Sequence, residues 1–134
     1  LCVDDNVSNV RVVTAALARL SGVRVVAAPL GELGLELAQA QHPALVLLDL
    51  HLPDMGGEEV LRVLRTDPAT ADIPVVMVSA DATPGAVRRL MARGAAGYLT
   101  KPIDVLDLLA CVRGYTVDRV PDPAPPTSPV PPPS

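Results

Sequence analysis

Hydrophobic positions along residues 1–119 follow two alternating periods, which indicates a chain built from strands and helices in turn. Short apolar or β-branched runs predict strands at 1–3, 23–28, 44–48, 74–78 and 97–99. Longer stretches with apolar residues three or four positions apart predict helices at roughly 8–20, 31–41, 57–66, 84–93 and 104–113. Because each strand is followed by a helix and the joins are short, we expect right-handed crossovers and one parallel sheet.

The segment 44–48 is the most informative of these runs, because it is apolar throughout, without alternation. A strand of this kind is buried on both faces, as in the centre of a parallel sheet. We therefore predict the α/β class: a doubly wound (βα)5 flavodoxin-like fold, with a five-stranded parallel sheet and helices on both faces. In such folds the ligand site lies beyond the carboxyl ends of the strands, where the strand order reverses.

Polar residues at the expected helix starts and glycines after the expected helix ends support these boundaries. Side chains that can cap a helix start are present at Ser8, Thr83 and Asp104. A left-handed residue is often needed where a helix ends, and glycines stand at such places at Gly22, Gly94 and Gly114.

The composition changes near residue 119. More than half of the residues from Pro121 to Ser134 are proline, which cannot donate a backbone hydrogen bond to a helix or a sheet. We predict one folded domain over 1–119 and a proline-rich, disordered tail over 120–134. A docking peptide for a proline-reading domain is a second interpretation of this tail, and a spacer is the simpler one.

Composition and charge narrow the classes of function. Hydrophobic residues make up 49% of the 134 positions, enough for a buried core in one domain. Aromatic residues make up 1%, which argues against an aromatic platform for single-stranded nucleic acid. The net charge of −4 argues against a basic surface that binds nucleic-acid phosphates.

The two cysteines, Cys2 and Cys111, lack metal-site spacing and stand in apolar surroundings. This pattern favours buried thiols over a disulfide framework. No apolar run is long enough to span a membrane, and no signal peptide is recognisable. The chain opens at Leu1 inside an apolar run, which indicates a truncated first strand and a segment cut from a longer protein.

Acidic and other polar residues follow the carboxyl ends of several expected strands. The residues at these ends are Asp4 and Asp5, then Asp49, then Ser79, and finally Thr100 and Lys101. Since the carboxyl ends of parallel strands share one edge of the sheet, we expect these side chains to gather there. Crowded carboxylates repel one another, and a divalent cation together with the Lys101 ammonium would neutralise them.

This set of side chains suits phosphoryl transfer. Carboxylate oxygens are ligands that Mg²⁺ prefers, and Mg²⁺ also holds phosphate oxygens. A carboxylate beside Mg²⁺ and a lysine is a competent nucleophile toward phosphorus, because the reaction depends mainly on in-line positioning and charge neutralisation. Ser79 is placed to donate a hydrogen bond to a phosphoryl oxygen. For Asp49 alone a solvated loop carboxylate would be the simpler interpretation, but the whole set favours the functional one.

The residues of this set resemble the receiver domain of two-component response regulators. The matching segments are VDDN (3–6), LLDLHLPDMGG (47–57), VVMVSA (75–80) and YLTKP (98–102). The intervals from Asp49 back to Asp5, 44 residues, and on to Lys101, 52 residues, are similar to those of the family. The resemblance extends from residue 1 to about residue 115, so that 1–119 would be a receiver domain.

The resemblance implies roles for the acidic residues. Asp49 is implied as the phosphorylated residue. Mg²⁺ is implied as the cofactor, bound by Asp5 and Asp49, by Asp4 through water, and by the backbone carbonyl of His51. Lys101 is implied to pair with the phosphoryl group or with Asp49, and the peptide bond between Lys101 and Pro102 resembles one that is usually cis in this family.

A conformational switch is also implied by the resemblance. Ser79 would be the switch hydroxyl that moves toward the phosphate, and Tyr98 would be the aromatic residue that swings inward with it. A fixed core tyrosine with its hydroxyl at the surface is the interpretation that the residues alone favour. The surface over roughly 84–113, which holds the fourth helix, fifth strand and fifth helix, would change on phosphorylation.

Weaker signals lie beside these motifs. His51 and Asp81 resemble flanking positions that tune the lifetime of the phosphoryl group, with Asp81 able to help hold a water, although a solvated loop histidine explains His51 equally well. His42 is interpreted as structural. Arg88 and Arg89 could contact a partner, but a solvated helix face explains them more simply.

We therefore predict a Mg²⁺-dependent phosphoacceptor that takes a phosphoryl group from phosphohistidine onto Asp49. The donor would be a histidine kinase or a histidine phosphotransfer domain, and the domain would be a slowly self-dephosphorylating substrate more than a turnover enzyme. The sequence resembles receivers fused behind hybrid sensor histidine kinases, which implies a cytoplasmic location on a parent chain that a membrane could anchor. No nucleic-acid or membrane contact is expected of this domain, and a homodimer is left open.

Three other classes of function compete with this prediction. A phosphorylation-independent docking module is disfavoured by the full acidic set and Lys101. An aspartate-nucleophile phosphatase would resemble DxDx[TV] at the nucleophile, whereas here His51 stands where the second acid would be. A flavin-binding doubly wound protein would need a Ser/Thr-rich phosphate loop after the first strand, and the sequence lacks one.

Overall fold

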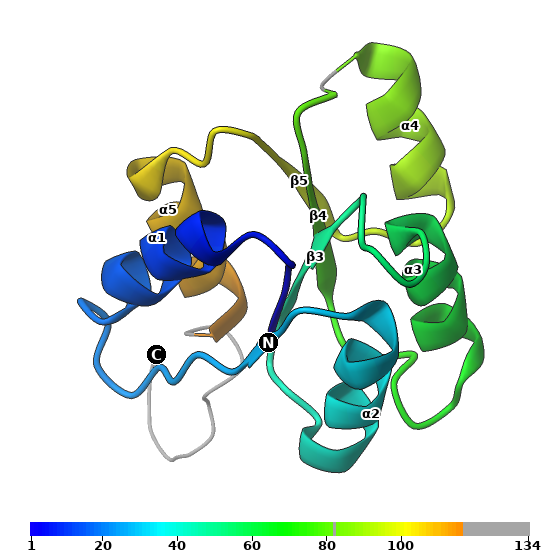
Figure 1. The fold of residues 1–134 in the computed structure, drawn as a ribbon, viewed down its shortest axis with the longest axis horizontal. Helices are drawn as coiled ribbons and strands as arrows, with labels where there is room; N and C mark the ends of the chain where they lie inside the picture. Colours follow the sequence, from blue (N-terminus) through cyan, green and yellow to red (C-terminus); the bar gives the residue numbers. More distant parts are fainter. Residues whose placement is uncertain (82, 117–134) are drawn as a thin grey trace, which may run out of the picture.

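The computed structural model describes residues 1–81 and 83–116, so the predicted tail over 120–134 lies outside the described residues. Within them, strands and helices alternate along the chain (Figure 1). The strands are β1 (Cys2–Val3), β2 (Ala27–Ala28), β3 (Val46–Asp49), β4 (Val75–Ser79) and β5 (Gly97–Thr100). The helices are α1 (Val7–Leu17), α2 (Gly31–Gln41), α3 (Gly57–Thr66), α4 (Pro84–Ala92) and α5 (Val105–Thr116).

All strand pairs in the sheet are parallel, and the spatial order is β2-β1-β3-β4-β5. The flavodoxin-like (βα)5 fold predicted from the sequence is therefore confirmed. The chain moves from β1 outward to β2 and then returns to form β3 on the other side of β1. The strand order thus reverses between β1 and β3, which is where folds of this type bind ligands.

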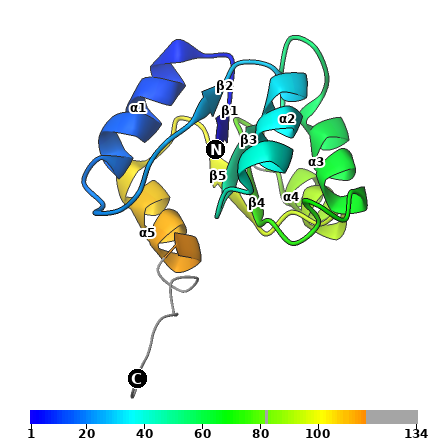
Figure 2. The same cartoon turned by 90° about the horizontal axis from the view of Figure 1, so that it is seen from below.

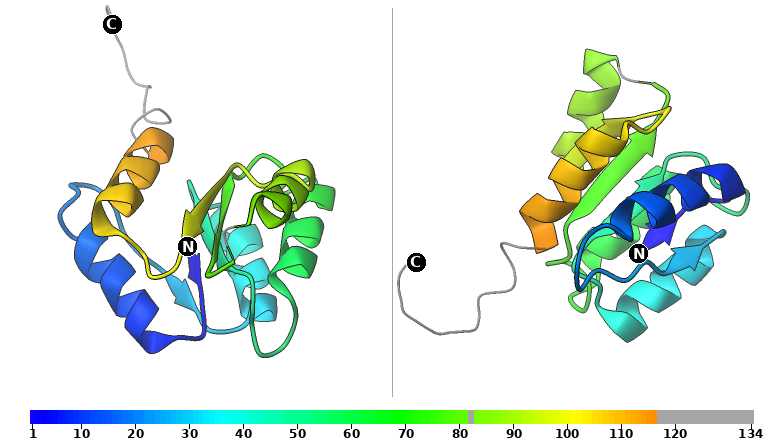
Figure 3. Two further views of the ribbon diagram at one scale, coloured as in Figure 1. Left: turned by 90° about the horizontal axis from the view of Figure 1, so that it is seen from above. Right: turned by 90° about the vertical axis from the view of Figure 1, so that its left-hand side faces the viewer.

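Helices cover both faces of the sheet. Figure 2 shows α1 and α5 on one face and α2, α3 and α4 on the other, and Figure 3 shows α1 and α5 side by side. Successive residues over 45–48 point to opposite faces, so Val46 and Leu48 join the core under α2–α4, whereas Leu45 and Leu47 join the core under α1 and α5. The prediction of a central strand buried on both faces is confirmed.

The edge strand β2 is shorter than predicted. The sequence predicted a strand over 23–28, whereas the structure has one over Ala27–Ala28 only. The partner of β2 is β1, which itself has two residues. The short length of β1 therefore limits how many residues of β2 can pair with it. The Cys2 N–H still donates to the carbonyl of Val26 at 2.8 Å, just before the ladder begins.

Two of the three predicted helix caps are confirmed. Thr83 caps α4 by accepting from the backbone N–H of Ala86, and Asp104 accepts from the N–H of Leu106 at 2.8 Å. The prediction for Ser8 is wrong, because α1 is capped by Asn6, whose side chain accepts from the backbone N–H of Ser8 itself.

Glycine positions at helix ends were partly predicted. Gly22 and Gly94 have φ of 80° and 106°, in the left-handed region that favours glycine. Gly114 does not end a helix, because α5 continues to Thr116. Its helix buries Leu108 and Val112 against the sheet, and we infer that this packing extends the helix past a residue of low propensity.

The cysteines are free thiols, Cys2 buried and Cys111 half-buried. Burial raises the pKa of the Cys2 thiol to about 11, so it stays neutral at ordinary pH. Among the described helices, none combines the length and the apolar character that crossing a bilayer requires.

Candidate functional site

Asp49 ends β3, in the middle of the carboxyl edge of the sheet. The residue is only 4% exposed, and a carboxylate buried to this degree requires charged or hydrogen-bonding partners. The Lys101 ammonium provides one, since its Nζ atom lies 3.0 Å from Asp49 Oδ1. Lys101 follows β5, and its peptide bond to Pro102 is cis, as the resemblance implied.

Asp4 and Asp5 follow β1, the strand beside β3. Asp4 is 6% exposed, and its Oδ1 atom accepts from the backbone N–H of Asn6 at 2.8 Å. Its Oδ2 atom accepts from the side-chain amide of Asn9 at 3.3 Å and lies 3.6 Å from Lys101 Nζ. Asp5 is exposed, so one carboxylate of the pair is held by the protein and the other faces solvent.

The predicted acidic cluster forms. One carboxylate oxygen from each of Asp4, Asp5 and Asp49 lies within 4.8 Å of the other two. Lys101 balances one of these negative charges, and a divalent cation would balance the other two. Carboxylate oxygens that converge at this spacing suit Mg²⁺, which takes oxygen ligands. The residues present therefore fit this ion.

The segment between β3 and α3 is a closed loop beside Asp49. The His51 N–H donates to Asp49 Oδ1 at 3.4 Å, and His51 forms an isolated antiparallel bridge with Gly56. The Gly57 N–H donates to the carbonyl of Leu50 at 2.8 Å. A Cβ atom at Gly57 would lie 2.7 Å from the Leu50 Cα atom and would also meet the carbonyl of Asp49, so only glycine fits there.

Ser79, Asp81 and Tyr98 meet on the other side of Asp49. Ser79 ends β4 and is 2% exposed, and its hydroxyl accepts from the backbone N–H of Asp81 at 3.1 Å. The Tyr98 hydroxyl donates to the backbone carbonyl of Asp81. The half-buried Tyr98 ring packs against the core under α2–α4. The switch hydroxyl and the switch aromatic that the resemblance implied therefore contact the same backbone segment.

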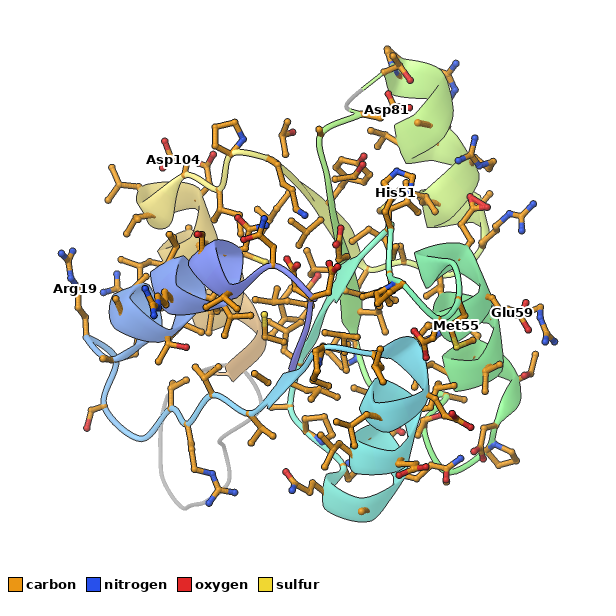
Figure 4. All side chains as sticks on the ribbon, in the orientation of Figure 1. Arg19, His51, Met55, Glu59, Asp81 and Asp104 are labelled. Atoms are coloured by element: carbon orange, nitrogen blue, oxygen red, sulfur yellow. The ribbon has the colours of Figure 1, made fainter. Side chains whose placement is uncertain are left out.

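The Asp81 side chain is exposed and bonds locally. Its carboxylate accepts from the backbone N–H of Thr83 at 3.1 Å, and hydrogen bonds from Thr83 hold the pKa of Asp81 below its usual value. Figure 4 shows Asp81 and His51 at the end of the molecule where β3 and β4 end. His51 is exposed. The roles predicted for these two side chains in phosphoryl lifetime stay predictions.

Sequence reasoning missed three residues of this region. Asn9 reaches Asp4 from the first turn of α1, Asp54 caps α2 from the loop after β3, and Gly57 makes room for the backbone of Leu50. The glycine pair Gly56-Gly57 was interpreted only as a turn into a helix. Asp54 stands inside the matching segment 47–57, but neither its partner on α2 nor the contact of Asn9 with Asp4 can be recognised from the sequence pattern.

Two positions outside the site have defined partners. His42 ends α2 with φ of 45°, and its Nε2 atom lies 3.0 Å from Asp72 Oδ1, which agrees with the structural interpretation of this histidine. Arg89 is more than part of a solvated face, because its Nε atom lies 2.8 Å from Glu58 Oε2 and joins α4 to α3.

Comparison with known families gives one clear result. A model of the response regulator receiver domain matches residues 1–113. The chain is 33% identical over 118 residues to the polar-differentiation response regulator DivK of Brucella ovis, covering 88% of this chain and 95% of that protein. It is 40% identical over 116 residues to the response regulator PleD of Caulobacter vibrioides, covering 87% of this chain and 25% of that protein.

Solved structures give the same result. The chemotaxis response regulator CheY4 of Vibrio cholerae has a TM-score of 0.78 and 27% identity, with 85% of this chain and 94% of that chain covered. The receiver domain of the sensor histidine kinase PA1611 from Pseudomonas aeruginosa has a TM-score of 0.76 and 27% identity, with 85% and 93% covered. That structure holds a magnesium ion coordinated in its active site cleft.

Proposed function

The chain belongs to the response regulator receiver domain family, and on that basis we propose that Asp49 is its phosphoacceptor. The observation that carries the proposal is the setting of Asp49. It is a buried carboxylate at the strand-order reversal, with an ammonium 3.0 Å from one of its oxygens and two further carboxylates close by. Receiver domains act in two-component signalling, so this site would receive a signal as a phosphoryl group.

We assign the metal to the acidic cluster. Asp5 and Asp49 would bind Mg²⁺ directly, with the backbone carbonyl of His51, and Asp4 would act through water. Bound there, Mg²⁺ would neutralise negative charge on the phosphoryl oxygens during transfer. Asp4 is already committed to Asn6, Asn9 and Lys101, which supports an indirect role for it.

In the transfer, a carboxylate oxygen of Asp49 attacks the phosphorus of a phosphohistidine on a partner. The new P–O bond makes an acyl phosphate, the P–N bond breaks, and the leaving imidazole nitrogen keeps the electron pair and takes up a proton. Lys101 stands 3.0 Å from Asp49 Oδ1 before transfer and would then pair with a phosphoryl oxygen. The buried Ser79 hydroxyl would donate to another such oxygen.

The signal would leave through the surface of α4, β5 and α5. If Ser79 turns toward the phosphoryl group, its hydroxyl no longer accepts from the N–H of Asp81. The Tyr98 hydroxyl is bonded to the same residue, so a shift of the loop after β4 would be transmitted to Tyr98 on β5. A rearrangement of this kind is a two-state change biased by local charge.

The remaining assignments rest on family membership. The donor would be a histidine kinase or a histidine phosphotransfer domain, and the phosphoryl group would be lost slowly to water. We propose that the receiver domain occupies 1–119, that the proline-rich residues 120–134 form a tail, and that the parent chain is a cytoplasmic or membrane-anchored hybrid kinase. The named receiver of the sensor histidine kinase PA1611 supports that parentage.

The test is phosphorylation by a small donor. The chain is incubated with acetyl phosphate and Mg²⁺, and its intact mass is measured. We expect an adduct of about 80 Da that a chelator suppresses and that Asp49→Asn abolishes. The matched control is Asp72→Asn, which removes an exposed carboxylate at the opposite end of α2 from the site.

The same experiment separates the competing function. An unmodified chain, under conditions that label a known receiver, would favour a docking module that works without phosphorylation. Steady release of phosphate from unrelated monoesters would favour a phosphatase instead.

A further inference from the structure

The start of α2 is capped from outside its own sequence. The residue before α2, Leu30, has no side chain that could accept a hydrogen bond there. Instead, the carboxylate of Asp54, in the loop between β3 and α3, accepts from the Gly31 N–H at 2.8 Å and from the Glu32 N–H at 3.0 Å. One carboxylate thereby satisfies two of the free donors at a helix start, where negative charge is favourable.

A second contact seats the same loop against α2. A Cβ atom at Gly31 would stand 2.6 Å from Met55 Cγ and 2.8 Å from Val60 Cγ2, so the close approach depends on glycine. Figure 4 shows Met55 between α2 and α3. Asp54 and Met55 are neighbours in this loop, and both contact the first turn of α2. The first contact is polar and the second is apolar.

The loop between β3 and α3 is short, so the contacts that hold Asp54 against α2 also restrain the other residues of the loop. It is closed by the bridge between His51 and Gly56 and by the hydrogen bond from Gly57 to the Leu50 carbonyl. Only Leu52 and Pro53 lie between His51 and Asp54. The His51 backbone therefore has little freedom to move while Asp54 remains bound to α2, and the His51 N–H lies 3.4 Å from Asp49 Oδ1.

We propose that Asp54 is a positioning residue for the acceptor site: by capping α2 across the loop, it fixes the backbone at His51, whose N–H donates to Asp49. The inference rests on the proposed function, since the His51 carbonyl is there assigned to Mg²⁺. Coupling of this kind is reciprocal, so a cation held by the His51 carbonyl would in turn strengthen the hydrogen bonds from Gly31 and Glu32 to Asp54.

The test measures Mg²⁺ affinity, which needs no phosphoryl donor. Titration of the chain with Mg²⁺, followed by amide NMR shifts, gives a dissociation constant for each variant. We expect Asp54→Ala to raise this constant about tenfold, as loss of an outer-shell partner does. Asp54→Asn should fall between these two chains, because the amide keeps one acceptor oxygen where the carboxylate has one for each of the two N–H groups.

Asp72→Ala is the matched control. It removes the same charge and a tether of the same helix, because Asp72 pairs with His42 at the other end of α2, but it lies away from the loop. We expect its Mg²⁺ dissociation constant to stay within about twofold of the original value. Hydrogen exchange at the Gly31 and Glu32 amides should be slowed by Mg²⁺ in the original chain and not in Asp54→Ala.

The outcomes separate this inference from the proposed function. If Asp54→Ala speeds exchange at Gly31 and Glu32 but binds Mg²⁺ as the original chain does, Asp54 is only a structural cap and the inference is wrong. If Asp72→Ala weakens binding as much as Asp54→Ala, general loss of charge or stability explains the effect and the inference is again wrong. A chain that binds no Mg²⁺ overturns the proposed function and the inference together.

Discussion

Lys101 reaches Asp49 across the carboxyl edge of the sheet and places its Nζ atom 3.0 Å from Oδ1, although the two residues are 52 positions apart in the sequence. The same nitrogen lies 3.6 Å from Asp4 Oδ2. The ammonium is therefore shared by two carboxylates that are both almost fully buried. This relationship supports a role for Lys101 in charge neutralisation, and it can be tested by substitution.

Removing the Lys101 ammonium should slow phosphorylation at Asp49. We expect Lys101→Ala to lower the rate of labelling by acetyl phosphate about 10²-fold, because a fixed positive group is lost from the site where phosphoryl charge develops. The rate is measured by intact mass over time at saturating Mg²⁺. Arg113→Ala, which removes an exposed positive charge from α5, is the control and should be labelled at the original rate. Equal rates for Lys101→Ala and the control would contradict the assignment.

The Tyr98 hydroxyl should matter for the output surface and not for the chemistry. Tyr98→Phe removes the donor to the Asp81 carbonyl and leaves the ring in the core. We expect labelling of Asp49 to stay within about twofold of the original rate, since the hydroxyl bonds to the loop after β4. Amide NMR shifts over α4, β5 and α5 should change less on phosphorylation than in the original chain. Identical shift changes in both chains would argue against transmission through Tyr98.

Alanine substitution should change the free energy of unfolding in opposite directions at two glycines, Gly57 and Gly85, which both lie in the first turn of a helix. At Gly57 a Cβ atom would stand 2.7 Å from the Leu50 Cα atom, and we expect the free energy of unfolding to fall by about 1–3 kcal/mol. At Gly85, in the first turn of α4, a Cβ atom meets nothing within 4 Å, and we expect a gain of about 0.5–1 kcal/mol. Urea unfolding followed by circular dichroism measures both.

The two variants also control each other for function. Gly57→Ala displaces the loop beside Asp49 and should slow its phosphorylation, whereas Gly85→Ala should not. If Gly57→Ala leaves the free energy of unfolding unchanged, the loop between β3 and α3 can move away from the added Cβ atom without loss of stability, and the prediction is wrong.

The cap that Asp54 provides should depend on pH in a defined direction. Hydrogen bonds from the backbone N–H groups of Glu32 and Gly31 hold the pKa of Asp54 below its ordinary value. A carboxyl group with a lowered folded-state pKa stabilises the fold above its unfolded pKa, about 3.9, and this stabilisation is lost as pH falls through the lower folded-state value. The Gly31 amide shift should therefore titrate with a midpoint below about pH 3.9.

Asp54→Asn supplies the control for this titration. The Asn side chain keeps one acceptor oxygen but does not titrate, so the acid transition at the Gly31 amide should disappear in that variant. A midpoint at or above the ordinary value in the original chain would show that the cap does not favour the charged carboxylate.

The sequence alone placed the elements well where the pattern was strong. The helices at 31–41 and 57–66 have the predicted bounds, because their ends coincide with changes in hydrophobic period that local residues determine. The buried strand around 44–48 was recognised because only a central strand is apolar on both faces. The order of the acidic residues along the chain was also sufficient to predict that Asp4, Asp5, Asp49 and Lys101 would meet.

Features that depend on contacts between distant segments could be seen only in the tertiary structure. The extent of β2 depends on a partner strand elsewhere in the chain. The cap of α1 is Asn6 and not Ser8, because two side chains that can cap a helix lie within one turn. Asp54 contacts Gly31, and Gly57 lies against Leu50. Neither contact can be predicted from the sequence of one partner alone. The amino-acid order determined which chemical groups come to the carboxyl edge, since strand ends are local features. Only the packed fold determined their separations and their partners, because those depend on how distant segments approach in space.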